Sequence, residues 1–89
     1  MTIYLYSECA LRAGQIAKPD HPDSFQWGSG SEAELIAQAR ERLAKRIDTR
    51  PGGAGDAFAH RCCRFVLEKF GLAHFDRATG EWEINEDEA

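Results

Sequence analysis

The stretch from Asp56 to Asn85 constrains the fold of this chain more than any other part of it. Its first half repeats apolar residues at the three- and four-residue spacing of an amphipathic helix. Asp56 stands where a helix N-cap belongs, and Gly71 stands where a C′ glycine ends a helix. Leu72 is placed for the apolar contact of a Schellman motif. The stretch therefore predicts a helix with a definite end, followed directly by a hairpin.

The expected hairpin strands are Ala73–Asp76 and Glu81–Asn85, joined by Arg-Ala-Thr-Gly. On the second strand Trp82 and Ile84 alternate with two glutamates, so one face is apolar and the other acidic. The apolar track of the preceding helix is Phe58, Cys62, Phe65, Val66 and Lys69, with Phe70 beside it.

A second helix is predicted from Ser31 to about Asp48. Ser31 and Glu34 form a capping box, in which each side chain bonds the backbone N–H of the other residue. The apolar residues of this helix share one face; they are Ile36, Ala39, Leu43 and Ile47. Residues 49–55 are rich in glycine and end the helix as a flexible connector, without the Gly-Lys-Ser/Thr ending of a phosphate-binding loop.

The N-terminal residues Thr2–Tyr6 predict a strand, and residues 7–30 give the least regular pattern, with Pro19 and Pro22 breaking it. At 89 residues the chain forms a single small domain, 1–89. The expected class is α+β, with two main helices packed on a small antiparallel sheet. That sheet would contain the C-terminal hairpin and the N-terminal strand.

Charge is unevenly distributed along the chain. The net charge is −4, but residues 40–70 hold eight Lys or Arg against four acids, and residues 75–89 hold six acids against one Arg. The three cysteines are an odd number, and neither a signal peptide nor a membrane span is recognisable, so we expect a cytoplasmic protein with reduced thiols and no membrane partner.

No set of residues predicts catalysis, a metal site or a cofactor. The cysteines and histidines lack zinc-ligand spacing, because the neighbours Cys62 and Cys63 point about 100° apart on a helix. Cys62 is expected in the core and Cys63 at its margin. His60 and Cys63 approach one another at i, i+3, but no oxyanion hole or third group accompanies them. We therefore expect a protein that is not an enzyme and that binds no cofactor.

Two charged groups remain as candidate binding residues. The first is basic and belongs to the two helices; its members are Arg40, Arg42, Lys45, Arg46, Arg50, Arg61 and Arg64. The second is acidic and belongs to the hairpin and the residues after it; its members are Glu81, Glu83 and Glu86. Either group suits a partner of opposite charge, and the alternative for the basic group is two solvated helix faces.

Residues 59–84 resemble the C-terminal half of a winged-helix DNA-binding domain. The resemblance rests on the helix AHRCCRFVLEKF, the pair Gly71-Leu72 and the hairpin AHFDRATGEWEI. It implies that the helix reads DNA through Arg61 and Arg64 and that Arg77 in the wing touches the DNA backbone.

Two functions follow as hypotheses. The first is a non-catalytic protein-binding module, similar in size and charge to phage and mobile-element proteins that inhibit host factors, including anti-CRISPR proteins. The second is a winged-helix-like nucleic-acid-binding protein that uses Arg42, Arg61 and Arg64. The net negative charge favours the first, because the mean field of the molecule repels phosphates. The partner, the oligomeric state and the choice between the basic and the acidic face stay open.

Overall fold

The computed structural model describes residues 1–44 and 54–84 of the chain. These residues form two helices and four strands. In chain order the elements are β1 (Thr2–Tyr6), β2 (Ser24–Ser29), α1 (Glu32–Ala44), α2 (Ala54–Lys69), β3 (Ala73–Asp76) and β4 (Glu81–Ile84). The α+β class predicted from the sequence is confirmed.

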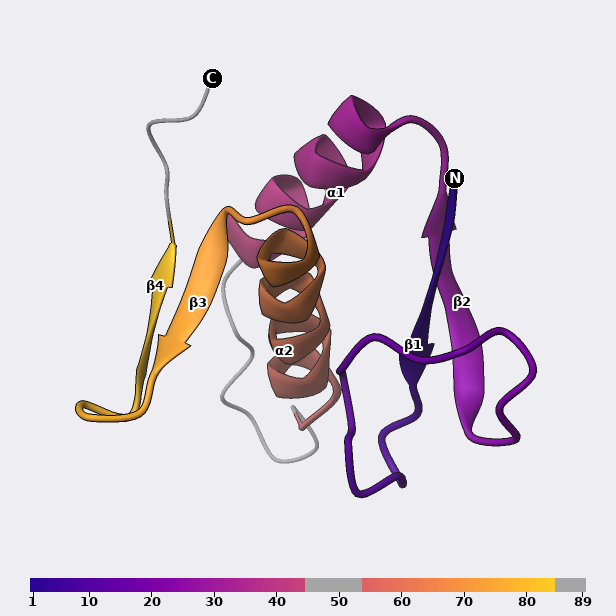
Figure 1. Cartoon of the computed structure of the whole chain (residues 1–89), viewed down its shortest axis with the longest axis horizontal. Coiled ribbons are helices and arrows are strands. Elements are labelled where there is room, and N and C mark those ends of the chain that lie inside the picture. The colour runs from indigo at the N-terminus through magenta and orange to yellow at the C-terminus, as the bar shows by residue number, and fades with distance from the viewer. Residues whose placement is uncertain (45–53, 85–89) are drawn as a thin grey trace.

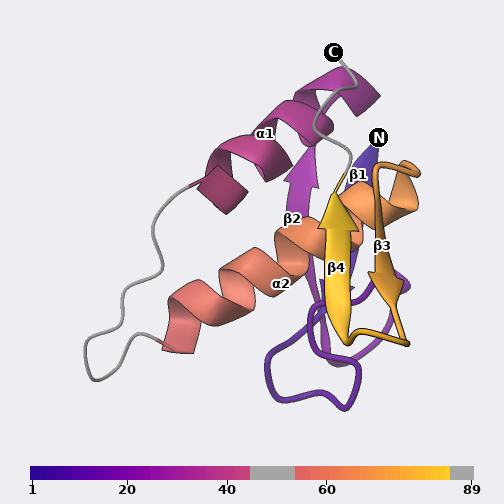
Figure 2. The same cartoon turned by 90° about the vertical axis from the view of Figure 1, so that its left-hand side faces the viewer.

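The elements lie in three layers. Figure 1 shows the β1–β2 sheet on one side, the β3–β4 hairpin on the other and α2 between them, with α1 crossing at one end of α2. Figure 2 confirms the order, because the hairpin lies in front of α2 and the β1–β2 sheet lies behind it. The two helices pack directly on each other, and the hairpin packs on α2. α2 therefore lies between the β1–β2 sheet and the β3–β4 hairpin.

The expected single sheet was wrong in its connectivity. β1 pairs antiparallel with β2, with Leu5 opposite Phe25, and the hairpin forms a separate two-stranded sheet. The second edge of β1 is also paired, because Tyr6 donates a hydrogen bond to the Gln15 carbonyl (2.9 Å) and Ala17 donates one to the Tyr4 carbonyl (2.8 Å). Both edges of β1 are therefore taken by residues 14–29, the part of the chain whose pattern was least regular, and the hairpin has no place beside it.

The N-terminus of α1 is built as the capping box predicted. Glu34 N–H donates to the Ser31 hydroxyl (3.1 Å), and Ser31 N–H donates to Oε1 of Glu34 (3.2 Å). The backbone bond from Ser31, together with the bond from its hydroxyl, holds the pKa of the Glu34 carboxyl below its usual value. Leu35 is fully buried with Ala39 although the apolar track omitted it, and the expected core residue Ile47 lies outside the described residues.

The N-terminus of α2 differs from the sequence expectation, whereas its C-terminus confirms it. The helix begins at Ala54, so Asp56 lies inside its first turn and is not the N-cap. Its C-terminus is the predicted Schellman motif: Leu72 N–H donates to the Leu67 carbonyl (2.9 Å), and Gly71 N–H donates to the Glu68 carbonyl (3.0 Å). Gly71 has a φ of 76°, which only glycine adopts without strain.

The hairpin has the predicted strands, except that the last expected residue, Asn85, lies outside the described residues. Phe75 lies opposite Trp82 and Ala73 lies opposite Ile84, so these four side chains share one face of the hairpin. Asp76 shapes the turn, because its Oδ1 accepts a hydrogen bond from Ala78 N–H and its carbonyl accepts one from Gly80 N–H, both at 2.8 Å. The apolar face is turned toward α2, where Trp82 packs on Phe65.

Candidate functional site

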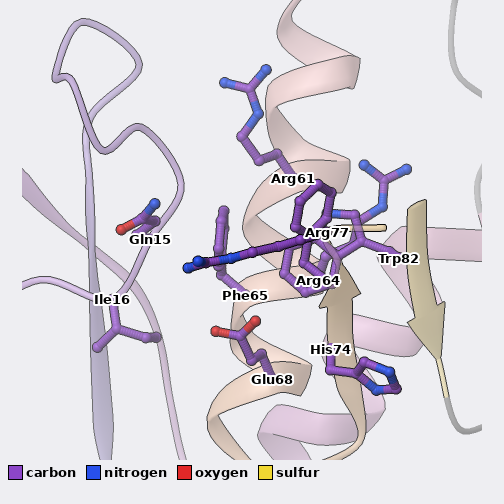
Figure 3. Close-up of a pocket in the computed structure, with 10 residues that line it drawn as sticks. Gln15, Ile16, Arg61, Arg64, Phe65, Glu68, His74, Arg77 and Trp82 are labelled. Carbon is purple, nitrogen blue, oxygen red and sulfur yellow. The ribbon is translucent and has the colours of Figure 1, made fainter. Parts of the chain in front are cut away.

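A groove with α2 as its floor is the main concave feature considered for function. It has a volume of about 720 Å³. In Figure 3, Gln15 and Ile16 stand on one side of the helix, and His74 of β3 stands on the other. We call it the α2 groove; its lining residues are Gln15, Ile16, Arg61, Arg64, Phe65, Glu68, His74, Phe75, Arg77 and Trp82.

The floor follows from helical spacing. Arg61, Phe65 and Glu68 recur at i, i+4 and i+7, so they project from one stripe of α2, and Arg64 lies beside that stripe. Phe65 meets the indole of Trp82 edge to face, with ring centroids 5.0 Å apart and planes at 90°. This aromatic contact fixes the hairpin on the helix and forms the apolar base of the groove.

The wall opposite the hairpin is made by residues 14–17, which are hydrogen-bonded to the edge of β1 that β2 does not occupy. Ile16 forms an isolated bridge with Leu5, which places its side chain at the sheet edge with 38% of its surface exposed. Gly14 is buried against the helix with a φ of +85°, and a β-carbon there would lie 3.0 Å from Cγ of Arg61. The close approach means that the backbone of Gly14 packs on the aliphatic part of Arg61, which holds this wall against α2.

The groove has a positive charge balance. Arg61, Arg64 and Arg77 face one acid, Glu68, among the lining residues. Within residues 1–44 and 54–84, none of the three guanidinium groups forms an ion pair with a carboxylate. The groove thus holds three positive charges that the described part of the chain does not neutralise, in a molecule with a net charge of −4.

The outer face of the hairpin has the opposite sign. Glu81 lies opposite Asp76, and Glu83 lies opposite His74, all pointing away from the apolar face. Oε2 of Glu83 is 2.9 Å from Nε2 of His74, and both side chains are about two-thirds exposed. The candidate residues Glu81 and Glu83 therefore form a solvent-exposed acidic surface on the other face of the strands that line the groove.

The described candidate basic residues lie in three places, and one of them, Arg40, lines a separate hollow with Leu43 and Ile84. Arg61 and Arg64 line the α2 groove, where they meet Arg77 of the hairpin turn. Arg42 lies elsewhere, with its guanidinium carbon 4.6 Å from the ring centroid of Trp27. Trp27 is only 8% exposed and belongs to the core. Four candidates lie outside the described residues; they are Lys45, Arg46, Arg50 and Glu86.

The two neighbouring thiols of α2 are core groups. Cys62 and Cys63 are both buried, so the placement of Cys63 at the core margin was wrong, and His60 is buried with them. Burial, with a smaller effect from Cys63, raises the pKa of Cys62 to about 12, and burial also raises the pKa of Cys63. Both thiols are protonated near neutral pH and are therefore poor nucleophiles.

Two further properties of the described residues bear on function. No group of three or more His, Cys, Asp or Glu side chains lies close enough there to hold a metal ion. Neither helix combines the length and apolar composition that crossing a membrane requires.

Sequence reasoning missed part of the groove. The pairing of Phe75 with Trp82 follows from the hairpin register and was recoverable, because opposite residues share a face. Gln15 and Ile16 had no such signal, since their position depends on hydrogen bonds to β1 across the chain. Arg77 was singled out only through the winged-helix resemblance.

The chain was compared with known proteins at three levels. No protein family, curated protein or solved structure matches it significantly. Its function must therefore be argued from the groove and the charged surfaces themselves.

Proposed function

We propose that this chain is a non-catalytic protein-binding module. The observation that supports the proposal is the α2 groove, in which arginines without an ion-pair partner among the described residues surround exposed apolar side chains. Buried aromatic and arginine groups in a concave site are the residues that contribute most to protein–protein affinity. The chain's size and net charge further suit a phage or mobile-element inhibitor of a host factor, acting in the cytoplasm where its three free thiols stay reduced.

The chemistry of the titratable groups supports a role without catalysis. The two thiols of α2 are protonated and enclosed, so neither supplies a thiolate to a substrate. The exposed pair of His74 and Glu83 lies on the outer face of the hairpin without a nucleophile beside it among the described residues. Binding is the activity that the arrangement of charges and apolar surface favours.

Nucleic-acid binding is the second candidate, on one specific observation. The α2 groove brings Arg61, Arg64 and Arg77 together with Phe75 and Trp82, and arginines next to aromatic rings are typical of single-strand binding surfaces. The overall charge of −4 and the acidic hairpin face next to the groove oppose this candidate.

One experiment separates the two candidates. The full chain is immobilised, exposed to a lysate of its native host, and the captured material is analysed by mass spectrometry and nucleic-acid staining. A protein that is captured in stoichiometric amount and survives nuclease treatment supports the module. Fluorescence anisotropy with duplex and single-stranded DNA at ~50 mM salt, where phosphate contacts are strongest, tests the second candidate.

The acidic surface is tested in the same assay. The variant Glu81→Lys/Glu83→Lys should lose the captured protein if the outer hairpin face is the contact surface. Its matched control is Glu32→Lys/Glu41→Lys, which reverses two exposed acids of α1. Circular dichroism checks that both variants keep the helices and the hairpin. Equal capture by both variants would exclude the acidic face and leave the α2 groove as the surface to be tested.

A further inference from the structure

We propose that the α2 groove binds an extended acidic peptide segment of a partner protein, with an aromatic or aliphatic side chain of that segment inserted between Ile16 and Phe75. The inference rests on the proposed binding function and names the chemistry of the partner. It follows from three features of the groove: arginines that form no ion pair with residues 1–44 and 54–84, exposed apolar walls and a position beside a strand edge.

The arginines define the charge of the occupant. Arg61 and Arg64 project from successive turns of α2, and Arg77 projects from the turn of the hairpin, so cations approach the groove from two elements. Guanidinium groups bind carboxylates through two parallel hydrogen bonds, which gives them preference for Asp and Glu side chains. Glu68 is the one acid of the lining, and it leaves a balance of +2 for an anionic ligand.

The walls define the apolar part of the occupant. Four large apolar side chains are exposed on the described chain, and two of them, Ile16 and Phe75, stand in the walls of this groove. Phe75 is 45% exposed although it packs on Trp82, with ring centroids 5.7 Å apart. A side chain placed between these walls is removed from water on several sides, which favours its binding.

The shape of the groove favours an extended chain. Figure 3 shows the lining residues on both sides of α2, with Gln15 and Ile16 on one side and the hairpin on the other. Among the described strands, β3 pairs only with β4, so its other edge offers backbone groups to a bound strand. An extended peptide alternates its side chains, so acidic residues and an apolar residue can address different parts of the lining.

A peptide fits these charges better than a nucleic acid does. A short peptide with a few acidic residues can match the three arginines in charge. It is also short enough to stay within the groove. A polynucleotide carries a charge at every residue and extends past the groove, toward Asp76, Glu81 and Glu83 of the hairpin. The repulsion on that side lowers its affinity relative to a short acidic peptide.

The test is fluorescence anisotropy of a fluorescein-labelled decapeptide of Gly and Ser that carries three Asp or Glu residues and one central Phe, titrated with the full chain at ~50 mM salt. Three comparison probes are used: the same peptide with Ala in place of Phe, the same peptide with Lys in place of its acids, and a ten-nucleotide oligo-dT. The groove variant is Arg61→Gln/Arg77→Gln. The matched control is Arg12→Gln/Lys18→Gln, which removes two exposed cations that do not line the groove.

We expect saturable binding of the acidic Phe peptide and no binding of the Lys peptide. The groove variant should bind about 5- to 30-fold more weakly, the sum of two partly exposed ion pairs, and the control variant should stay within about twofold of the parent. The variant Phe75→Ala should remove the preference for Phe over Ala in the peptide. The variant Arg77→Glu reverses one charge of the groove. Because Arg77 is exposed in the hairpin turn, this change should leave the fold intact.

Three results would overturn the inference: no saturable binding of the acidic peptide, equal affinity of the groove and control variants, or tighter binding of oligo-dT. The proposed module fails separately, if the parent chain captures no protein from its host. Capture that is equal for the parent and the groove variant would keep the module and reject the groove as its acidic-peptide site.

Discussion

The substitution Gly14→Ala tests the packing that closes one wall of the α2 groove. Gly14 has a φ of +85°, and an added β-carbon would lie 3.0 Å from Cγ and 3.1 Å from Cδ of Arg61. The backbone conformation alone costs an alanine about 1–2 kcal/mol. The contact adds about 1 kcal/mol, at the low end for overpacking, because an arginine stem can move by a few tenths of an ångström.

Two other glycines of the same chain are matched controls. Gly71 and Gly80 have φ values of 76° and 73°, and a β-carbon at either one meets no atom within 4 Å. Gly71→Ala and Gly80→Ala therefore strain the backbone at positive φ, but the added methyl group touches no other residue. The difference between Gly14→Ala and these controls isolates the packing of the segment on α2.

Urea unfolding followed by tryptophan fluorescence measures the difference. With an m-value of about 1 kcal/mol/M for a small domain, Gly14→Ala should unfold at a midpoint ~1 M below those of the two controls. In the Arg61→Ala background the extra loss should disappear, because Cγ and Cδ are absent. An equal midpoint for all three glycine variants, or an extra loss that persists without the Arg61 stem, would refute the packing of Gly14 on α2.

Three further predictions concern the helices. Ser31→Ala should lower the free energy of unfolding by about 0.5–2 kcal/mol, measured by urea titration, because it removes a hydrogen bond of the capping box. Arg42→Gln should cost about 0.5–2 kcal/mol and change the tryptophan emission, since the guanidinium lies over Trp27 at 4.6 Å. The contribution of Cys62 to stability should fall above pH ~9, because Cys62 keeps its proton in the folded state up to a pKa of about 12 while the unfolded thiol ionises from about 9. The loss from this group is about 1.4 kcal/mol between pH ~8 and pH ~10, and Cys62→Ala should lack it in urea titrations at the two pH values.

The parts of the fold that were predictable from the sequence depend on neighbouring residues. The capping box of Ser31, the Schellman end at Gly71 and the hairpin register of Phe75 and Trp82 each involve residues within about ten positions of one another. Local hydrogen-bonding patterns and side-chain alternation encode such features directly. They gave the correct helices, hairpin and α+β class.

The remaining features depend on contacts between distant residues. Leu5 pairs with both Phe25 and Ile16, and no local pattern shows that both edges of β1 are filled from the irregular segment. The burial of Cys63 also depends on distant contacts. The periodicity of α2 identifies one apolar stripe, but the helix is covered by α1 and by the hairpin on different faces. One wall of the candidate groove was missed for this reason, whereas Arg61 and Arg64 of its floor were already candidate binding residues.

The arrangement of two separate sheets on one helix has a consequence for motion. In the described chain the hairpin rests on α2, whereas the other wall of the groove is hydrogen-bonded into the β1–β2 sheet. The hairpin can then open as a local unit about Gly71 without disturbing β1, and its amides should exchange with deuterium faster than those of β1. A ligand in the groove should slow amide exchange in β3 more than in β1. Exchange of the β3 amides would therefore measure whether the groove is occupied.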